Sequence, residues 1–322
     1  MIKLRNTLLL ATLLCSPGWG AGRIVNGEPA LEGTAPWQVE LYSTYVYTPA
    51  ELAADAALPD GNQSKRYYAD RAGWEVHHMC GGSYLGGNWI LTAAHCVVLR
   101  HAGDDVRQLR RIRLGTQDLN HGGTTFRIER VVIHKDYDDE VHQHDLALIH
   151  VAADAATDRR AIALLRPVRL LGSKTSDPVL LPYKRVAVTG WGATSVREAD
   201  ASPLRGEDGQ LIHDSPILMQ AELTVLPQAK CEAIADFKGM LGGMICAGSS
   251  AAKVQDSCQG DSGGPLTLAI GPNERVLIGV VSWGMGCGLA GMPGLYTDVT
   301  TADVRRWIAQ AKHAPPGQIS RR

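Results

Sequence analysis

The segment DSCQGDSGGP, residues 256–265, concentrates residue types that suit chemistry better than packing. Ser262 is followed there by two glycines and a proline. A serine hydroxyl is a weak nucleophile until an adjacent base removes its proton. The usual base is a histidine whose tautomer is fixed by a hydrogen-bond acceptor. We therefore expect one histidine and one buried acid of this chain to fold next to Ser262.

Among the 11 histidines, His95 has the sequence context expected of such a base. It lies in LTAAHC, residues 91–96, at the end of an apolar run and between small residues that would let its ring face a cleft. Asp145 opens the apolar segment DLALI, where a carboxylate would be partly buried and would need a partner. Other histidines occur in polar stretches and are expected to be solvated: His77, His78, His101 and His121.

Composition and patterning limit the scaffold that positions these residues. The chain has 322 residues, 45% of them hydrophobic, which is enough for one large core or two smaller ones. Its net charge of -1 gives no global field that would favour nucleic acid or an anionic membrane. Short apolar runs separated by Gly or Pro predict an all-β barrel or sandwich. The one expected helix spans residues 302–311, capped by Thr301 or Asp303, and residues 312–322 form a tail.

Residues 1–20 have the pattern of a secretory signal. Lys3 and Arg5 precede the apolar run Leu8–Leu14, and small residues follow at Gly18 and Gly20. This run is too short to span a membrane, and no second long apolar run exists. We expect the mature chain to be exported, either to the extracellular space or to a bacterial periplasm. Cys15 would also permit a lipoprotein signal, but the bulky Leu14 before it argues against that interpretation.

Six of the seven cysteines remain once the signal is removed: Cys80, Cys96, Cys231, Cys246, Cys258 and Cys287. An even number in an oxidising compartment predicts three disulfides, although about fifteen connectivities are open. The sequence contains no CxxC pair, so we expect no metal site.

Three stretches interrupt the strand pattern. Residues 44–76 are interpreted as an inserted surface loop, which could narrow the substrate range, bind a partner, or have no role. Residues 195–215 form a second long loop. Residues 152–166 are rich in Ala and Arg and are expected to connect two halves of the chain.

TAAHC, DLALI and GDSGGP, in this order, resemble the chymotrypsin–trypsin family of secreted serine proteases. The resemblance runs from Ile24 to about Gln310. It implies a protease domain at 24–311 with two packed six-stranded antiparallel β-barrels, at about 24–150 and 166–300, and a C-terminal α-helix. It implies that Ser262 is the nucleophile, that His95 is the general base and acid, and that Asp145 orients the histidine. The amides of Gly260 and Ser262 would form the oxyanion hole.

The resemblance also implies a substrate preference and a disulfide pairing. Asp256 corresponds to the floor of the primary specificity pocket, where an acid selects Arg or Lys before the cleaved bond. The residues matching the rest of this pocket are Ser257, Ser282, Trp283, Gly284 and Gly294. The implied disulfides are Cys80–Cys96, Cys231–Cys246 and Cys258–Cys287.

Arg23-Ile24-Val25-Asn26-Gly27 resembles the activation site of a zymogen. Cleavage after Arg23 would release the propeptide 21–23 and create an ammonium group on Ile24. That ammonium would insert and pair with Asp261, which would order the oxyanion loop.

The expected function is a trypsin-like serine endopeptidase that needs no cofactor. The loop Gly115–Glu129 offers Asp118 and Glu129 but lacks the pair of glutamates of the vertebrate calcium loop, so calcium is not expected. The expected partners are proteins or peptides with exposed Arg or Lys, an activating protease and protein inhibitors, with no nucleic acid and no membrane span. We expect a monomer. Two alternatives remain open: a narrow processing protease, and a catalytically idle binding module on the same fold.

Overall fold

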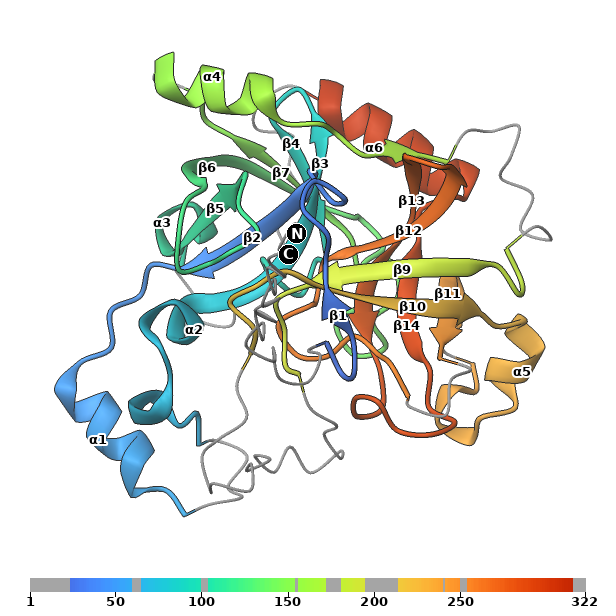
Figure 1. Cartoon of the computed structure of the whole chain (residues 1–322), viewed down its shortest axis with the longest axis horizontal. Coiled ribbons are helices and arrows are strands. Elements are labelled where there is room, and N and C mark those ends of the chain that lie inside the picture. Colours follow the sequence, from blue (N-terminus) through green and yellow to red (C-terminus); the bar gives the residue numbers. More distant parts are fainter. Residues whose placement is uncertain are drawn as a thin grey trace, which may run out of the picture.

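The computed structural model describes residues 24–59, 65–99, 104–153, 156–171, 181–194, 214–239, 241–249 and 254–314. Short strands form most of the regular structure and lie around two large buried clusters (Figure 1). Alternation explains the strands: in β6 (Thr124–Ile133), Phe126 and Ile128 are buried, whereas Arg127 and Glu129 are exposed. The strands therefore present one apolar face to each core.

The first half of the chain forms a closed antiparallel barrel of six strands. The strands follow the order β2-β3-β4-β7-β6-β5 around the barrel. Their bounds are β2 Gln38–Ser43, β3 His78–Gly86, β4 Trp89–Thr92, β5 Arg110–Leu114, β6 as given above, and β7 Ala147–Val151. The short helix α3 (Val106–Leu109) leads into β5.

The second half forms another closed antiparallel barrel, in the order β9-β10-β11-β14-β13-β12, because β12 and β10 both pair with β9. The strands are β9 Arg185–Gly190, β10 Met219–Val225, β11 Met244–Gly248, β12 Pro265–Gly271, β13 Glu274–Trp283 and β14 Gly294–Asp298. Two short strands add to it: β1 (Glu28–Pro29) and β8 (Arg169–Leu170). Two short helices, α5 (Gln228–Glu232) and η3 (Ala235–Phe237), precede β11. The predicted pair of six-stranded barrels is confirmed.

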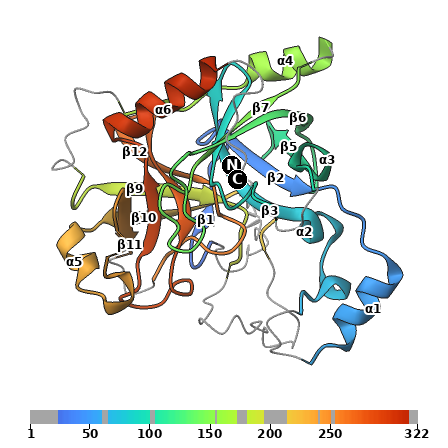
Figure 2. The same ribbon diagram turned by 180° about the vertical axis from the view of Figure 1, so that it is seen from behind.

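The N-terminal end of the described chain packs on the second barrel, and the C-terminal end packs on the first. β1 pairs with β10 of the second barrel, and Ile24 lies in that barrel's buried cluster. The terminal helix α6 (Ala302–His313) is capped by the Thr301 side chain and buries Val304, Ile308 and Ala311 in the cluster that fills the first barrel. In Figures 1 and 2, α6 lies beside the ends of the first-barrel strands. Residues 24–29 thus belong with the second barrel, not with the first as expected.

The segment 44–76 contains helices that the sequence analysis missed. α1 (Pro49–Ala57) begins with a capping box in which the side chain of Thr48 and that of Glu51 each accept a backbone N–H. η1 (Tyr68–Asp70) and α2 (Gly73–His77) follow. α1 projects from the body of the molecule in both views (Figures 1 and 2). The connection at 152–166 also contains a helix, α4 (Ala156–Leu164). Most of 195–215 lies outside the described residues.

Candidate active site

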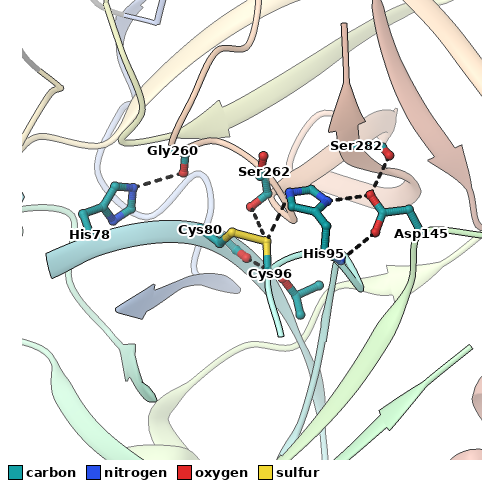
Figure 3. The surroundings of a disulfide bond; sticks show 10 residues. His78, Cys80, His95, Cys96, Asp145, Gly260, Ser262 and Ser282 are labelled. Carbon is teal, nitrogen blue, oxygen red and sulfur yellow. Dashed lines mark hydrogen bonds and ion pairs between the residues drawn. A yellow bond between two sulfur atoms is a disulfide. The ribbon is translucent and has the colours of Figure 1, made fainter. Parts of the chain in front are cut away.

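His95 and Asp145 meet at one end of the first barrel. β4 and β7 are antiparallel neighbours in which Thr92 lies opposite Ala147, so the segment that follows β4 comes close to the segment that precedes β7. His95 Nδ1 donates to Asp145 Oδ2 at 2.7 Å, and the backbone N–H of His95 donates to Oδ1 at 2.9 Å. Figure 3 shows the imidazole held edge-on by the carboxylate. With Nδ1 bound to Asp145, the lone pair of Nε2 remains available to act as a base.

Ser282, in β13 of the second barrel, also contacts Asp145. Its hydroxyl donates to Asp145 Oδ2 at 2.7 Å (Figure 3). Burial raises the pKa of the Asp145 carboxyl, but the hydrogen bonds from His95 and Ser282 outweigh it and hold the pKa below its ordinary value. Asp145 is therefore ionised at neutral pH. The sequence predicts Ser282 only among the substrate-binding residues, and its contact with Asp145 was not predicted.

The loop that carries Ser262 is fixed between the two barrels. Ser262 O accepts from Gly81 N of β3 at 2.7 Å, and Gly263 N donates to Val281 O of β13 at 2.8 Å. Gly263 has φ +79°, and a Cβ there would lie 2.1 Å from Thr92 Oγ1. Only glycine fits this position, because both the backbone angle and the space exclude a side chain.

Ser262 lies beside the imidazole of His95, next to the Cys80–Cys96 disulfide (Figure 3). Cys96 Sγ is 3.7 Å from His95 Nε2 and 3.7 Å from Ser262 O. Among the hydrogen bonds of the described residues, none joins Ser262 Oγ to His95. Catalytic hydrogen bonds are often long without substrate and tighten when it binds.

The backbone amides of Gly260 and Ser262 donate to no acceptor among the described residues. Gly260 has φ +91°, and a Cβ there would lie 2.8 Å from Gly192 Cα. The carbonyl of Gly260 accepts from His78 Nε2 at 3.0 Å. The hydrogen bond from His78 therefore fixes the peptide group between Gly260 and Asp261. The N–H of Gly260 remains available to a ligand.

His78 was expected to be solvated, and that prediction is wrong. Its ring is completely buried, with Nδ1 3.2 Å from Glu40 Oε1 and Nε2 bonded to Gly260 O. Glu40 lies on the neighbouring strand β2, and its Oε2 is 3.2 Å from Arg113 Nε. Burial opposes protonation of His78, but the Glu40 carboxylate outweighs this and raises the pKa of the imidazole. Because both ring nitrogens face acceptors, the protonated form suits the site.

Asp261 is buried below the Ser262 loop. Oδ1 accepts from Gly192 N and Oδ2 from Cys258 N, both at 2.9 Å. A Cβ on Gly190 would lie 2.0 Å from Oδ1, so this strand must approach the carboxylate without a side chain. Burial raises the pKa of Asp261 to about 6. Gly190 and Gly192, which leave the space for this acid, were not predicted from the sequence.

The start of the described chain, which the sequence predicts to be an activation site, lies close to Asp256. Ile24 is fully buried, and Val25 forms a β-bridge with Asp256. Arg23 lies outside the described residues. In the intact chain the nitrogen of Ile24 is an amide, and the hydrogen bonds of the described residues do not include one from it to Asp261.

Asp256 is buried at the base of a group of small residues. Its Oδ2 accepts from Gly288 N at 3.0 Å, whereas Oδ1 has no hydrogen-bond partner in the described part of the chain. A Cβ on Gly294 would lie 3.0 Å from Oδ1, and one on Gly284 would lie 3.8 Å from Gly294 Cα. Burial raises the pKa of Asp256 to about 7. The structure thus holds an unpaired carboxylate oxygen beside Gly294, where a side chain would crowd it.

The remaining expected residues lie around this acid. The hydroxyls of Ser257 and Tyr296 are 3.0 Å apart. Trp283 ends β13 and packs edge-on against Phe237, with ring centroids 5.6 Å apart. The structure contains the disulfides Cys80–Cys96, Cys231–Cys246 and Cys258–Cys287. The last of these connects the segment of Asp256 to that of Gly288.

The two acids considered for calcium do not share a site. Asp118 pairs with His121 at 3.0 Å, and Glu129 pairs with His150 at 2.6 Å. Within the described ranges, neither acid belongs to a group of three or more side chains that could hold a metal ion. In the part of the chain that the structure describes, no helix has the length and apolar character needed to cross a bilayer.

Comparison with known proteins decides the family. The model of the family described as Trypsin matches residues 58–308, which is most of the chain. The chain belongs to the trypsin family. His95, Asp145 and Ser262 thus occur in this order in a trypsin-family chain, and the resemblance seen in the sequence is confirmed.

Relatives of this trypsin-family chain include Trypsin Blo t 3 of Blomia tropicalis, 32% identical over 87% of the chain and 84% of the relative. Tissue-type plasminogen activator of Bos taurus is 31% identical over 69% of the chain and 37% of its own length. Transmembrane protease serine 11G of Rattus norvegicus is 29% identical over 89% and 54%. The chain therefore spans about a third to a half of the length of the latter two.

The fold is similar to the solved structure of neuropsin, a serine protease expressed in the limbic system of mouse brain. The TM-score is 0.59 at 26% sequence identity, and the match covers 90% of this chain and all of that one. Family and fold together identify a serine peptidase scaffold.

Proposed function

We propose that this protein is an exported trypsin-like endopeptidase that hydrolyses peptide bonds after Arg or Lys through Ser262, His95 and Asp145. The observation that supports this most is the unpaired, buried Oδ1 of Asp256 beside Gly294, in a chain whose His95–Asp145 pair lies next to Ser262. A buried carboxylate without a partner is costly, so the site favours a guest that brings a cation.

The geometry supports the following course of acyl transfer. His95 Nε2 takes the proton of Ser262 as Oγ attacks the scissile carbonyl carbon, and Asp145 stabilises the resulting imidazolium. The free amides of Gly260 and Ser262 receive the oxyanion. His95 then gives the proton to the departing amine, which leaves an ester on Ser262. Water, deprotonated by the same histidine, hydrolyses that ester. These steps are the mechanism known for this family.

Activation is proposed to proceed by cleavage after Arg23. The new ammonium of Ile24 would bring a positive charge to Asp261, a buried carboxyl whose pKa is raised by its burial. The pair would fix the position of the Gly260–Ser262 loop. We propose a monomer, an activating protease and protein inhibitors as partners, and no required cofactor.

The proposed function is tested by hydrolysis of Arg-, Lys- and Phe-ended chromogenic peptides before and after limited trypsin treatment. Ser262→Ala is the control for contaminating trypsin. Cleavage after Arg and Lys alone, appearing with a new Ile24 terminus, would support the proposal. If small peptides are cleaved but casein is not, the enzyme is a narrow processing protease. Inactivity despite a confirmed Ile24 terminus would favour the idle binding module.

The raised pKa of Asp256 predicts how cation binding depends on pH. Only the ionised carboxylate pairs with a cation, so affinity for benzamidine should fall as pH drops through about 7, by roughly tenfold per unit below it. Equilibrium binding to Ser262→Ala between pH 8 and pH 5 measures this. Asp256→Asn should bind weakly at every pH. An affinity that stays constant down to pH 5 would contradict the prediction.

Asp261 should make the intact chain less stable as pH rises. A carboxyl whose folded pKa is about 6, against an ordinary 3.8, stabilises the fold below pH 3.8 and loses that contribution as pH rises through 6. The loss is on the order of 3 kcal/mol. Urea unfolding of Ser262→Ala, with and without Asp261→Asn, should show a stability difference that changes by this amount from pH 4 to pH 8. A pH-independent difference would refute the assignment.

A further inference from the structure

The carboxylate of Glu75 is buried, although Glu75 belongs to the segment 44–76 that interrupts the strand pattern. Glu75 is 3% exposed and lies in α2, the helix that leads into β3. Its Oε1 accepts from Arg71 Nη1 and from the backbone N–H of Asp214, each at 3.2 Å. Arg71 Nη1 is also 3.6 Å from Asp214 Oδ2. A buried carboxylate must be paired and hydrogen-bonded, so these three residues, which we call the brace, fix α2 to the chain at Asp214.

The chain at Asp214 is connected to the loop that carries the oxyanion amides. Asp214 forms an antiparallel β-bridge with Ala193. The N–H of Ala193 donates to Gln259 O at 2.8 Å, and the N–H of Gly192 donates to Asp261 Oδ1 at 2.9 Å. Two hydrogen bonds therefore join the bridge partner of Asp214 and its neighbour to this loop.

α2 reaches the same loop a second time, through His78. His78 follows α2 directly, and its Nε2 donates to Gly260 O at 3.0 Å (Figure 3). The centroid of its ring is 6.4 Å from that of Trp74 in α2 and 6.3 Å from that of Trp191. A Cβ on Gly260 would lie 2.8 Å from Gly192 Cα and 3.3 Å from His78 Nε2. Gly260 is therefore held between two segments that are both anchored to α2.

We propose that Arg71 and Glu75 are positioning residues, which act through the brace to hold the amides of Gly260 and Ser262 where they receive the oxyanion. Such donors are effective only when they are fixed in advance at the point where charge develops. Loss of the brace would free one of the two segments that enclose Gly260, and the amides would lose this fixed position. The effect on catalysis rests on the proposed peptidase function, whereas the coupling between α2 and the loop does not.

The kinetic test compares the activated parent enzyme with Glu75→Ala and Glu75→Gln. Alanine removes the acceptor of both donors, so kcat should fall by about 10-fold with little change in KM, less than the loss of about 10²- to 10³-fold that follows removal of an oxyanion donor. Glutamine keeps an oxygen that can accept the Asp214 N–H, and it should restore most of the activity. An unchanged kcat in Glu75→Ala would overturn the proposal.

The control for this comparison is Asp70→Asn, which changes an exposed acid of the same segment and should retain parental kinetics. Two ligands then separate positioning from general damage to the site. A peptide aldehyde ending in arginine adds to the Ser262 hydroxyl and places its oxygen at the oxyanion amides, so Glu75→Ala should weaken its binding by the same factor as kcat/KM. Benzamidine, which needs only the Asp256 pocket, should bind as it does to the parent. Equal losses for both ligands would overturn the proposal.

The coupling itself is tested without activity, by amide hydrogen exchange of the full chain carrying Ser262→Ala. Adding Glu75→Ala should speed exchange at the N–H groups of Gly192 and Asp261 by about 10-fold, because both hydrogen bonds depend on the segments that the brace holds. Asp70→Asn should leave these rates unchanged. Parental exchange in Glu75→Ala would overturn the proposal. If exchange depends on Glu75 but the activated chain cleaves no peptide, the coupling stands and the proposed function fails.

Discussion

Replacing Asp256 with serine is expected to lower kcat/KM for substrates cleaved after Arg or Lys by about 10⁴- to 10⁵-fold. The carboxylate is buried, one oxygen is bound to Gly288 N, and the other is free to pair with a cation. Serine leaves the cationic end of the substrate in the same desolvated place without a counter-charge. Steady-state kinetics with matched Arg-, Lys- and Phe-ended peptides measure the change.

Two observations separate this effect from a damaged fold. Asp256→Ser removes a carboxyl that is unfavourable to ionise, so the variant should unfold at an equal or higher urea concentration at pH 8. Asp118→Ser, which changes an acid elsewhere on the first barrel, should retain parental kinetics. If Asp256→Ser kept its preference for Arg and Lys, another residue would have to supply the counter-charge.

Replacing Asp145 with asparagine is expected to lower kcat by about 10⁴-fold, as the corresponding change does in this family. All three partners of the carboxylate are donors: the His95 amide, His95 Nδ1 and the Ser282 hydroxyl. Asparagine has one acceptor and one donor, so its NH₂ would face a donor or force Nδ1 to accept. In the latter tautomer Nε2 carries the proton and cannot take that of Ser262.

The kinetic pattern distinguishes this from loss of structure. Asp145 does not reach the substrate, so KM should change little while kcat falls. Ser282→Ala is the graded control, since it removes one donor to Asp145 but leaves the histidine tautomer intact, and its loss should be much smaller. Equal losses in the two variants would show that packing, not the tautomer, is what Asp145 provides.

The barrels could be predicted because alternation and turn residues are local, as β6 shows with its buried Phe126 and Ile128. The placement of Ser262 beside His95 came from motif order and not from periodicity. α1 was missed although Thr48 and Glu51 form a recognisable capping box, because the Ala-rich segment carries no apolar stripe for a core.

Other features had no signal within their own segment. The burial of His78 depends on Glu40 of a neighbouring strand and on Gly260, 182 positions along the chain. The contact of Ser282 with Asp145 spans 137 positions and joins the two barrels. The close approach of Gly190 to Asp261 is likewise set by tertiary packing. Contacts between distant segments such as these cannot be predicted from the sequence of one segment alone.

The crossing of the chain ends makes each barrel depend on residues from the far end of the sequence. The second barrel takes up Ile24 and β1, and the core of the first barrel takes up Val304 and Ile308 of α6. An N-terminal fragment that ends within residues 152–166 would carry Ile24 and β1, which the second barrel needs. It would lack α6, which completes the core of the first barrel. The two halves should therefore refold together as a complementing pair, and neither should be a stable autonomous domain.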